Sequence, residues 1–300
     1  MNIQWYPGHM TKAKRAMQED IKLIDLIIEV VDARIPFSSR NPDIDELGKN
    51  KARLILLNKS DLASETWNDA WAEWFKSQGF HVVKVNSRSG AGLKQINAVV
   101  QEACKEKIER DRRRGILNRP VRAMVVGIPN VGKSTFINSF AGKACAKTGN
   151  KPGVTKGNQW IRLNKSLELL DTPGILWPRF ENQEVGLRLA FIGSINDEIL
   201  NKEELAMELL KFMMKKYSDV LSERYEIGDD IVSAYLASEN GTKAERDKEA
   251  FAALAQVAKS RACLLKGNEY DYKKAANLFL DDYRGGRLGQ ITLEFPPVKE

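Results

Sequence analysis

The stretch VRAMVV (121–126), followed directly by GIPNVGKS (127–134), decides the fold of this chain. The first part is an apolar, β-branched run, which is typical of a buried parallel strand. The second part matches G-x-x-x-x-G-K-[ST], and residues 135–141 can form the helix that this pattern requires next. The backbone N–H groups of such a loop point at a phosphate group, aided by the start of the helix. The stretch therefore predicts a P-loop.

Strands and helices alternate on both sides of this loop. Apolar runs predict further strands at 25–33, 53–57, 81–85, 159–163 and 167–170, with helices at 66–78 and 93–114. Such alternation is typical of a doubly wound α/β sheet. Trp67, Trp71 and Trp74 are spaced i, i+4, i+7, which predicts one packed face of a helix.

The pattern changes after Pro178. Amphipathic stretches predict helices from Glu203 to Tyr283, including 243–265 and 272–283, and residues 290–295 predict a short β-like tail. We therefore expect an α/β domain at 1–178 and a small all-α domain at 179–300.

Around the P-loop, several residues have the chemistry to bind a triphosphate and Mg²⁺. Lys133 supplies positive charge to the β- and γ-oxygens, and the Ser134 hydroxyl can hold the metal. Asp171, in the DTPG sequence (171–174), can reach the Mg²⁺ shell through water, and the Gly174 N–H can contact the γ-phosphate. Thr155, in KPGVT (151–155), can complete the coordination of Mg²⁺. We expect the loop residues Asn130, Val131, Gly132, Lys133, Ser134 and Thr135 to contact the nucleotide.

Two other segments indicate which base is bound. In NKSD (58–61), the Asp61 carboxylate can accept two hydrogen bonds from the ring N–H and amine that guanine presents and adenine lacks. Asn58 can bridge loops, and the Lys59 stem can stack over the ring. NSRSG (86–90) is suited to a backbone N–H contact with the guanine carbonyl. We expect Asn58, Lys59, Ser60, Asp61, Asn86 and Ser87 to bind the guanine end of GTP.

The base motifs precede the P-loop, whereas in ordinary GTPases the P-loop comes first. Circular permutation preserves the packing of a domain when the old ends are joined, here through residues 93–120. The fold class that we predict is therefore α/β, a circularly permuted P-loop GTPase domain followed by a small all-α domain. The new order also leads from DTPG straight into the all-α domain, so loss of the γ-phosphate could shift that domain.

The residue after the DTPG glycine is Ile175, where Ras-type proteins have a glutamine that orients the attacking water. An aliphatic side chain cannot polarise water, so intrinsic hydrolysis should be slow. His9 is a candidate for the missing role, with an ordinary place at the start of a helix as the alternative. His81 begins a strand, which indicates a structural role. The Asn130 side-chain oxygen could bind a monovalent cation such as K⁺.

Charge and composition favour a cytoplasmic protein that meets a polyanion. The net charge is +7, distributed as +11 over residues 1–178 and −4 over 179–300, and the stripe 105–122 has eight basic and three acidic residues. Such a stripe attracts phosphate backbones, although a solvated helix face is the alternative. The three cysteines are too far apart for a zinc site, and no apolar run is long enough to span a bilayer.

The chain closely resembles the YlqF/RbgA family of circularly permuted GTPases, which assist assembly of the large ribosomal subunit. The shared motifs are WYPGHM (5–10), DARIP (32–36), NKSD (58–61), GIPNVGKST (127–135), KPGVT (151–155) and LLDTPGILWP (169–178). The resemblance implies a C-terminal RNA-binding domain, stimulation of the GTPase by the large subunit, dependence on K⁺ through Asn130 and a catalytic His9. The segment NSRSG departs from the commoner SAK form, and the acidic balance of 179–300 restricts any RNA surface there to a local one, at Lys259, Arg261, Lys266, Lys273 and Lys274 or at Arg284 and Arg287.

These observations predict a GTP-hydrolysing assembly factor that uses Mg²⁺ and acts on the precursor of the large ribosomal subunit and its rRNA. We expect a monomer in the cytoplasm, with neither a membrane nor DNA as partner. A signalling GTPase that acts on a protein partner is the alternative. A metabolic P-loop kinase is disfavoured by NKSD and by the two switch motifs.

Overall fold

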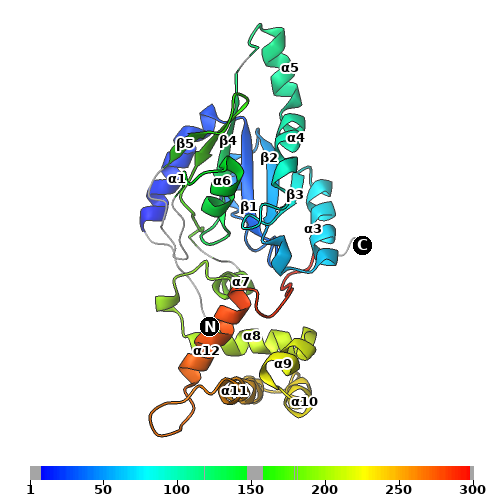
Figure 1. Cartoon of the computed structure of the whole chain (residues 1–300), viewed down its shortest axis with the longest axis vertical. Helices are drawn as coiled ribbons and strands as arrows, with labels where there is room; N and C mark the ends of the chain where they lie inside the picture. Colours follow the sequence, from blue (N-terminus) through cyan, green and yellow to red (C-terminus); the bar gives the residue numbers. More distant parts are fainter. Residues whose placement is uncertain (1–7, 118, 147–157, 179, 181, 298–300) are drawn as a thin grey trace.

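The computed structural model in Figure 1 describes residues 8–117, 119–146, 158–178, 180 and 182–297. An α/β domain forms one end of the elongated molecule and a group of helices the other. Within the described residues, no helix is long and apolar enough to span a lipid bilayer.

One sheet forms the centre of the α/β domain. Its order is β3-β2-β1-β4-β6-β5, with bounds β1 Leu26–Asp32, β2 Ala52–Asn58, β3 His81–Val85, β4 Val121–Val126, β5 Gln159–Arg162 and β6 Leu167–Asp171. All neighbours are parallel except the edge strand β5, which runs antiparallel to β6. The six predicted strands are confirmed, and the P-loop strand β4 lies between β1 and β6, in the middle of the sheet.

Helices cover both faces of this sheet, as expected for a doubly wound fold. They are α1 Gly8–Asp20, α2 Asp43–Leu47, α3 Glu65–Ser77, α4 Leu93–Ala103, α5 Lys105–Arg113 and α6 Lys133–Ala141, with short 3₁₀ turns η1 Ile21–Leu23 and η2 Ser60–Leu62. Trp71 and Phe75 of α3 pack with Val31 and Leu57 in a small core cluster. Residues of α1, α4 and α6 belong to the larger core cluster, which also includes residues of β1 and β4. The helix predicted at 93–114 is divided in two at Cys104.

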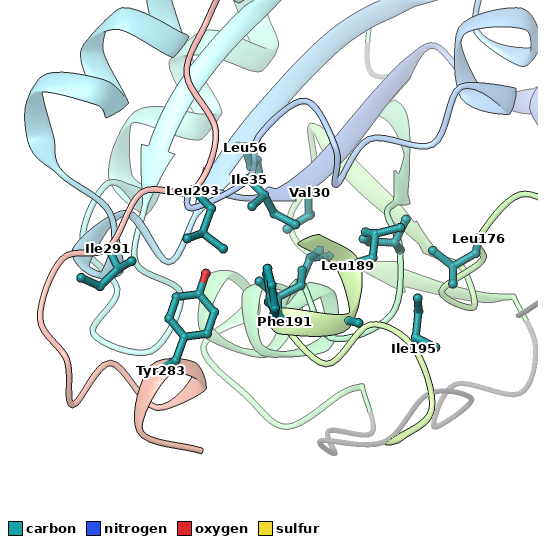
Figure 2. Packing of buried hydrophobic residues seen from close by; sticks show 14 of the residues in the cluster. Val30, Ile35, Leu56, Leu176, Leu189, Phe191, Ile195, Tyr283, Ile291 and Leu293 are labelled. Carbon is teal, nitrogen blue, oxygen red and sulfur yellow. The ribbon is translucent and has the colours of Figure 1, made fainter. Parts of the chain in front are cut away.

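The second part of the chain is helical, as predicted. It consists of α7 Gln183–Phe191, η3 Asp197–Ile199, α8 Lys202–Lys216, α9 Ser218–Tyr225, α10 Asp229–Ala237, α11 Lys243–Ser260 and α12 Tyr272–Arg284. Helix α8 is central, because α10, α11 and α12 all pack on it. Apolar side chains of α7 and of the turn after it, including Leu189, Phe191 and Ile195, lie near Val30 and Ile35 of the α/β domain (Figure 2).

The prediction of a β-like tail at 290–295 is wrong, because these residues form no strand. The tail returns to the α/β domain and bonds to its loops instead of to a strand edge. The Ile291 N–H donates to the Leu62 carbonyl at 3.0 Å, and the Leu293 N–H donates to the Arg34 carbonyl at 3.0 Å. The indole of Trp71 donates to the Glu294 carbonyl at 2.9 Å.

Candidate functional site

The motifs selected from the sequence meet at one edge of the sheet. Parallel strands present their carboxyl ends at the same edge, and loops there form the usual ligand site of an open α/β sheet. Asp32 pairs with Asn58, Asn58 with Val85, and Val125 with Asp171 across neighbouring strands. The sequences that follow these five strands therefore lie close together.

The P-loop follows β4 and has the backbone shape that its glycines allow. Gly132 has φ +95°, and a Cβ there would lie 2.5 Å from Nδ2 of Asn58. At Gly127 an added Cβ would lie 2.5 Å from the Val30 carbonyl oxygen. Asn130 has φ +63°, in the left-handed region that few residues other than glycine adopt. The loop thus approaches two neighbouring strands too closely for larger residues at either glycine.

Lys133 is buried at the start of α6, and its ammonium group lies against the loop that it follows. Nζ donates to the carbonyls of Gly127 at 3.0 Å and Ile128 at 3.3 Å. Burial lowers the pKa of Lys133 to about 8, although Asp171 nearby opposes this shift. A buried cation surrounded by carbonyl oxygens is suited to a polyanionic ligand, which would compensate its charge.

Asp171 ends β6 beside this lysine and is 1% exposed. Burial raises its pKa to about 6, in spite of the positive charge of Lys133. Its Oδ1 atom has no hydrogen-bond partner among the described residues. A buried carboxylate oxygen without a partner is costly unless a cation or water binds it. Ser134 lies in the first turn of α6, and its hydroxyl and the Asp171 carboxylate are oxygen donors of the kind that Mg²⁺ prefers.

Asn58 joins the P-loop to the loop after β3. Its Nδ2 donates to the Val131 carbonyl at 2.7 Å, while its Oδ1 accepts from Ser87, from the N–H at 3.1 Å and the hydroxyl at 2.7 Å. Asn58 and Ser87 are almost fully buried. The bridging of loops by Asn58 that the sequence predicted is therefore present.

The other base-motif residues surround this bridge. Asp61 is exposed in η2, with no hydrogen bond or ion pair to any residue that the structure describes. The Ser60 hydroxyl donates to the Val85 carbonyl at 3.1 Å, which ties NKSD to the end of β3. The Asn86 side chain accepts from the N–H groups of Arg88 and Ser89, which shapes the NSRSG loop. An exposed carboxylate beside two fixed loops can accept from a planar base.

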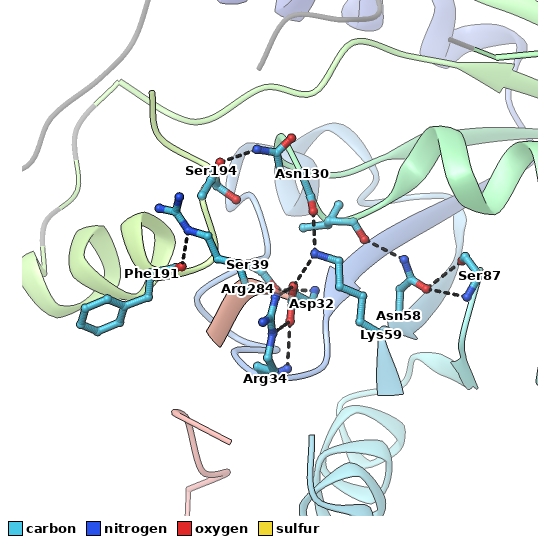
Figure 3. A network of polar contacts seen from close by, with 12 residues as sticks. Asp32, Arg34, Ser39, Asn58, Lys59, Ser87, Asn130, Phe191, Ser194 and Arg284 are labelled. Atoms are coloured by element: carbon cyan, nitrogen blue, oxygen red, sulfur yellow. Dashed lines mark hydrogen bonds and ion pairs between the residues drawn. The ribbon is translucent and has the colours of Figure 1, made fainter. Parts of the chain in front are cut away.

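A buried ion network lies beneath Lys59 (Figure 3). Lys59 Nζ donates to Asp32 Oδ2 at 2.9 Å and to the Asn130 carbonyl at 2.7 Å. Asp32 in turn accepts from Nε and Nη2 of Arg34, at 2.9 and 2.8 Å. Although burial opposes it, the charges of Arg34 and Lys59 hold the pKa of Asp32 well below its usual range. Burial lowers the pKa of Lys59.

Asp32 and Arg34 are not among the predicted site residues. Both residues belong to the DARIP motif (32–36), and this motif is the local signal that marks them. An Asp that ends a buried strand and an Arg two residues later, at the edge where the other motifs lie, are candidates for a site. In the structure Arg34 holds Asp32, and Asp32 holds Lys59, whose stem we expect to cover the base.

The P-loop also contacts the helical part of the chain. The Ser194 hydroxyl donates to the Pro129 carbonyl at 2.7 Å, and Nδ2 of Asn130 donates to the Gly193 carbonyl. Arg284 of α12 holds this turn, donating to the Ala190 and Phe191 carbonyls at 2.8 and 2.9 Å. Ser194 and Arg284 are thus site-supporting residues that local sequence patterns did not reveal.

Arg284 and Arg287, which the sequence analysis assigns to a local RNA surface, have internal partners in the structure. Arg284 forms an ion pair with Asp197 at 2.8 Å and is 19% exposed. Arg287 forms an ion pair with Asp282 of α12. Arg261 donates to the Arg224 carbonyl at 2.9 Å. The remaining lysines of the predicted RNA surface form no ion pair with any residue that the structure describes: Lys259, Lys266, Lys273 and Lys274.

The segment after DTPG packs against α1. Gly174 lies so close to Lys133 that an added Cβ would be 2.9 Å from Nζ. Ile175 is buried, and its carbonyl accepts from Nδ2 of Asn41 at 3.2 Å. The Leu176 N–H donates to the sulfur of Met10 at 3.4 Å. The start of α1 therefore lies beside the residues that follow DTPG.

Two predicted site residues are not fully described. His9 is the second residue of α1, directly before Met10, but its side chain lies outside the described part of the structure. Thr155 lies entirely outside the described residues.

Comparison with known proteins identifies the family. Residues 122–243 match the model of the family described as 50S ribosome-binding GTPase. Ribosome biogenesis GTPase A of Bacillus cereus is 48% identical, covering 99% of this chain and 95% of the relative. The GNP-bound crystal structure of YlqF from Thermotoga maritima matches with TM-score 0.61 and 27% identity, over 95% of this chain and 98% of that one. A GDP-bound YlqF structure matches with TM-score 0.60 and 26% identity, over 93% and 98% of the two chains. With the sheet order and the P-loop described above, these similarities show that the chain belongs to the Ribosome biogenesis GTPase A (RbgA/YlqF) family and is a P-loop GTPase.

Proposed function

We propose that this protein binds and hydrolyses GTP while it assists assembly of the large ribosomal subunit, and that it contacts the subunit precursor and its rRNA. The observation that carries the GTP-binding part is the Asn58 bridge, which fixes the base motifs against the P-loop. The names of its relatives, Ribosome biogenesis GTPase A and 50S ribosome-binding GTPase, support the ribosomal part. The protein acts as a monomer in the cytoplasm. No specific observation favours the alternative of a signalling GTPase.

In this proposal the base lies between NKSD and NSRSG. Asp61 accepts from the guanine ring N–H and amine, and its exposure supports this role. Lys59, fixed by Asp32, covers one face of the ring with its stem. Asn58, Ser60, Asn86 and Ser87 hold the two loops, through the side-chain bonds described above.

The triphosphate lies along the P-loop, from Asn130 to Thr135. Lys133 stabilises the β- and γ-phosphates, and charge on these oxygens grows as the bond to the γ-phosphate breaks. The Gly174 N–H, which lies beside Lys133, contacts the γ-phosphate. Mg²⁺, when bound, neutralises phosphate charge; its protein ligands are Ser134, Thr155 and, through water, Asp171. The buried Asp171 Oδ1 atom without a partner supports this assignment.

Hydrolysis needs a group that orients water, and Ile175 is both aliphatic and buried. We assign that role to His9, because α1 begins beside the residues that follow DTPG. We assign a K⁺ ligand to the Asn130 side-chain oxygen, because Asn130 lies within the P-loop, where a bound cation would add positive charge beside the phosphates. The intrinsic rate should be slow and should rise on the large subunit.

The decisive experiment measures GTP turnover with and without purified large subunits, in K⁺ and in Na⁺. We expect stimulation by subunits and a higher rate in K⁺. Turnover that subunits leave unchanged would exclude the ribosomal role. The His9→Ala variant should lose stimulated turnover while its affinity for nucleotide stays intact, and His81→Ala provides the matched histidine control. Equal turnover of His9→Ala and the parent protein would remove His9 from the mechanism.

A further inference from the structure

A basic arm projects from the end of the α/β domain that lies opposite the helical domain (Figure 1). It consists of α5 and the residues up to 117. Arg112, Arg113 and Arg114 in its last turn are exposed, with no ion pair or side-chain hydrogen bond to any residue that the structure describes. Asp111, which precedes Arg112, is buried and is paired with Lys107 at 3.1 Å, and the exposed Glu109 forms no ion pair with any residue that the structure describes. The three guanidinium groups are therefore available to an external anion.

The arm ends in a fixed turn. Gly115 has φ +79°, and the Ile116 N–H donates back to the Asp111 carbonyl at 2.9 Å, as in a Schellman cap. Such a cap usually buries the apolar residue that follows it, but here Ile116 is 43% exposed and Leu117 75% exposed. The cap therefore presents apolar side chains next to the arginines instead of packing them.

The β5–β6 hairpin lies at the same end of the domain (Figure 1) and carries an exposed aromatic ring. Trp160 of the edge strand is 42% exposed, and the guanidinium carbon of Arg122 lies 5.4 Å from the centroid of its ring. Arg122 also pairs with Glu168 at 3.3 Å. These side chains line an open hollow of about 270 Å³, with Leu23, Ile161 and Arg162 completing the lining.

This combination fits single-stranded nucleic acid better than protein. An aromatic ring beside an arginine stacks on bases of any sequence, and nearby basic groups neutralise the flanking phosphates. A carboxylate such as that of Glu168 can accept a hydrogen bond from an exocyclic amine of the base. A protein partner would instead favour an apolar centre depleted of charge.

We propose that this end of the domain is an RNA-binding surface, separate from the nucleotide site and from the helical domain. Arg112–Arg114 bind the phosphates of large-subunit rRNA, and Trp160 stacks on an unpaired base that enters the hollow beside Arg122. This inference rests on the proposed function, which supplies rRNA as the partner.

The test measures binding of full-length protein to a large-subunit rRNA transcript and to purified large subunits at several salt concentrations. Neutralising the three arginines (Arg112→Ala, Arg113→Ala, Arg114→Ala) should lower the slope of log affinity against log salt by about two to three, since each phosphate contact contributes roughly 0.7–0.9. Trp160→Ala should weaken binding about tenfold without changing that slope.

The matched control replaces three exposed lysines elsewhere on the domain (Lys49→Ala, Lys76→Ala, Lys94→Ala), and should change the slope by much less. GTP affinity and turnover without ribosomes should be unchanged in every variant, which shows that the nucleotide site remains folded. The proposal would be wrong if both test variants kept the affinity of the parent protein and its slope of log affinity against log salt. If the test variants bind subunits more weakly but bind the transcript as the parent protein does, the surface contacts a ribosomal protein and not RNA. If the parent protein binds neither probe, the proposed function itself fails.

Discussion

The guanidinium carbon of Arg34 lies 4.8 Å from the centre of the Tyr283 ring, and its Nη1 donates to the Tyr283 carbonyl at 3.1 Å. Arg34 follows β1, whereas Tyr283 belongs to α12, near the other end of the chain. The same guanidinium binds Asp32, which holds Lys59 of the base motif. One buried side chain therefore connects the predicted base site to the helical domain.

Arg34→Ala should lower the free energy of unfolding by about 3–5 kcal/mol, because it leaves the buried carboxylate of Asp32 without its principal partner. The thermal midpoint, followed by circular dichroism, measures the loss. Lys76→Ala, which breaks an exposed pair with Glu73, is the control and should change stability by no more than about 0.5 kcal/mol. A melting temperature of Arg34→Ala equal to that of the control would show that the network does not stabilise the fold.

Asp61→Asn should weaken GTP binding on the order of 100-fold, because two charge-assisted hydrogen bonds to guanine are lost or become neutral. It should also improve binding of XTP, since xanthine has a carbonyl where guanine has an amine, and an amide can donate to it. Titration with fluorescent GTP and XTP analogues measures both effects. Because Asp61 is exposed and makes no bond to the described residues, stability should stay unchanged. Undiminished GTP affinity would rule out Asp61 as the acceptor from guanine.

Much of the fold could be predicted from sequence because it depends on local patterns. The runs at 121–126 and 167–170 became neighbouring buried strands, and Gly127 and Gly132 lie where only a small residue fits. The bridging role of Asn58 was also predicted, since the chemistry of an amide and its place after a strand were enough. The predicted tail strand failed because its bonding partners, such as the Arg34 carbonyl, are distant in sequence.

The partners of the residues that support the site were beyond prediction for the same reason. Arg34 has its partner Tyr283 at a sequence separation of 249 residues, and the Ser194 hydroxyl bonds to Pro129, which is 65 residues away. From the sequence alone Arg284 is expected at the surface, because its partners are backbone carbonyls at the end of α7, which no side-chain pattern indicates. Periodicity indicates which face of an element is buried, but not which loop it meets.

Asp282 should make stability depend on pH. The carboxylate is buried, pairs with Arg224 at 2.7 Å and accepts from the Tyr225 hydroxyl at 2.8 Å. Although burial opposes the effect, the hydrogen bonds of Arg287, Tyr225 and Arg224 hold the pKa of Asp282 below its ordinary value. A lowered pKa in the folded state gives stability that is present above the ordinary pKa and is lost as the pH falls through the folded value.

Asp282→Asn should therefore cost about 2 kcal/mol at pH 7, and the difference from the parent protein should shrink as the pH falls below about 4. Urea unfolding at a series of pH values measures both. The matched control, Asp281→Asn on the exposed side of α12, should give a curve parallel to that of the parent. A gap between Asp282→Asn and the parent that does not change with pH would show that packing, and not charge, accounts for the loss.

Arg284→Ala should weaken nucleotide binding although the side chain lies outside the proposed nucleotide contacts. Arg284 fixes the turn after α7, and that turn holds the P-loop through the Ser194 hydroxyl and the Gly193 carbonyl. Without these bonds the P-loop is less ordered in the free protein, and part of the free energy of nucleotide binding is used to order it. We therefore expect the affinity for GDP to fall about 5- to 20-fold, which is within the range of a typical coupling between two sites. Ser194→Ala, which removes one hydrogen bond to the loop, should give a smaller loss of the same kind. Lys248→Ala, at a site where the side chain is 82% exposed, should leave affinity unchanged. If Arg284→Ala lowers the melting temperature but binds GDP like the parent, the turn supports the helical domain alone and does not couple it to the nucleotide site.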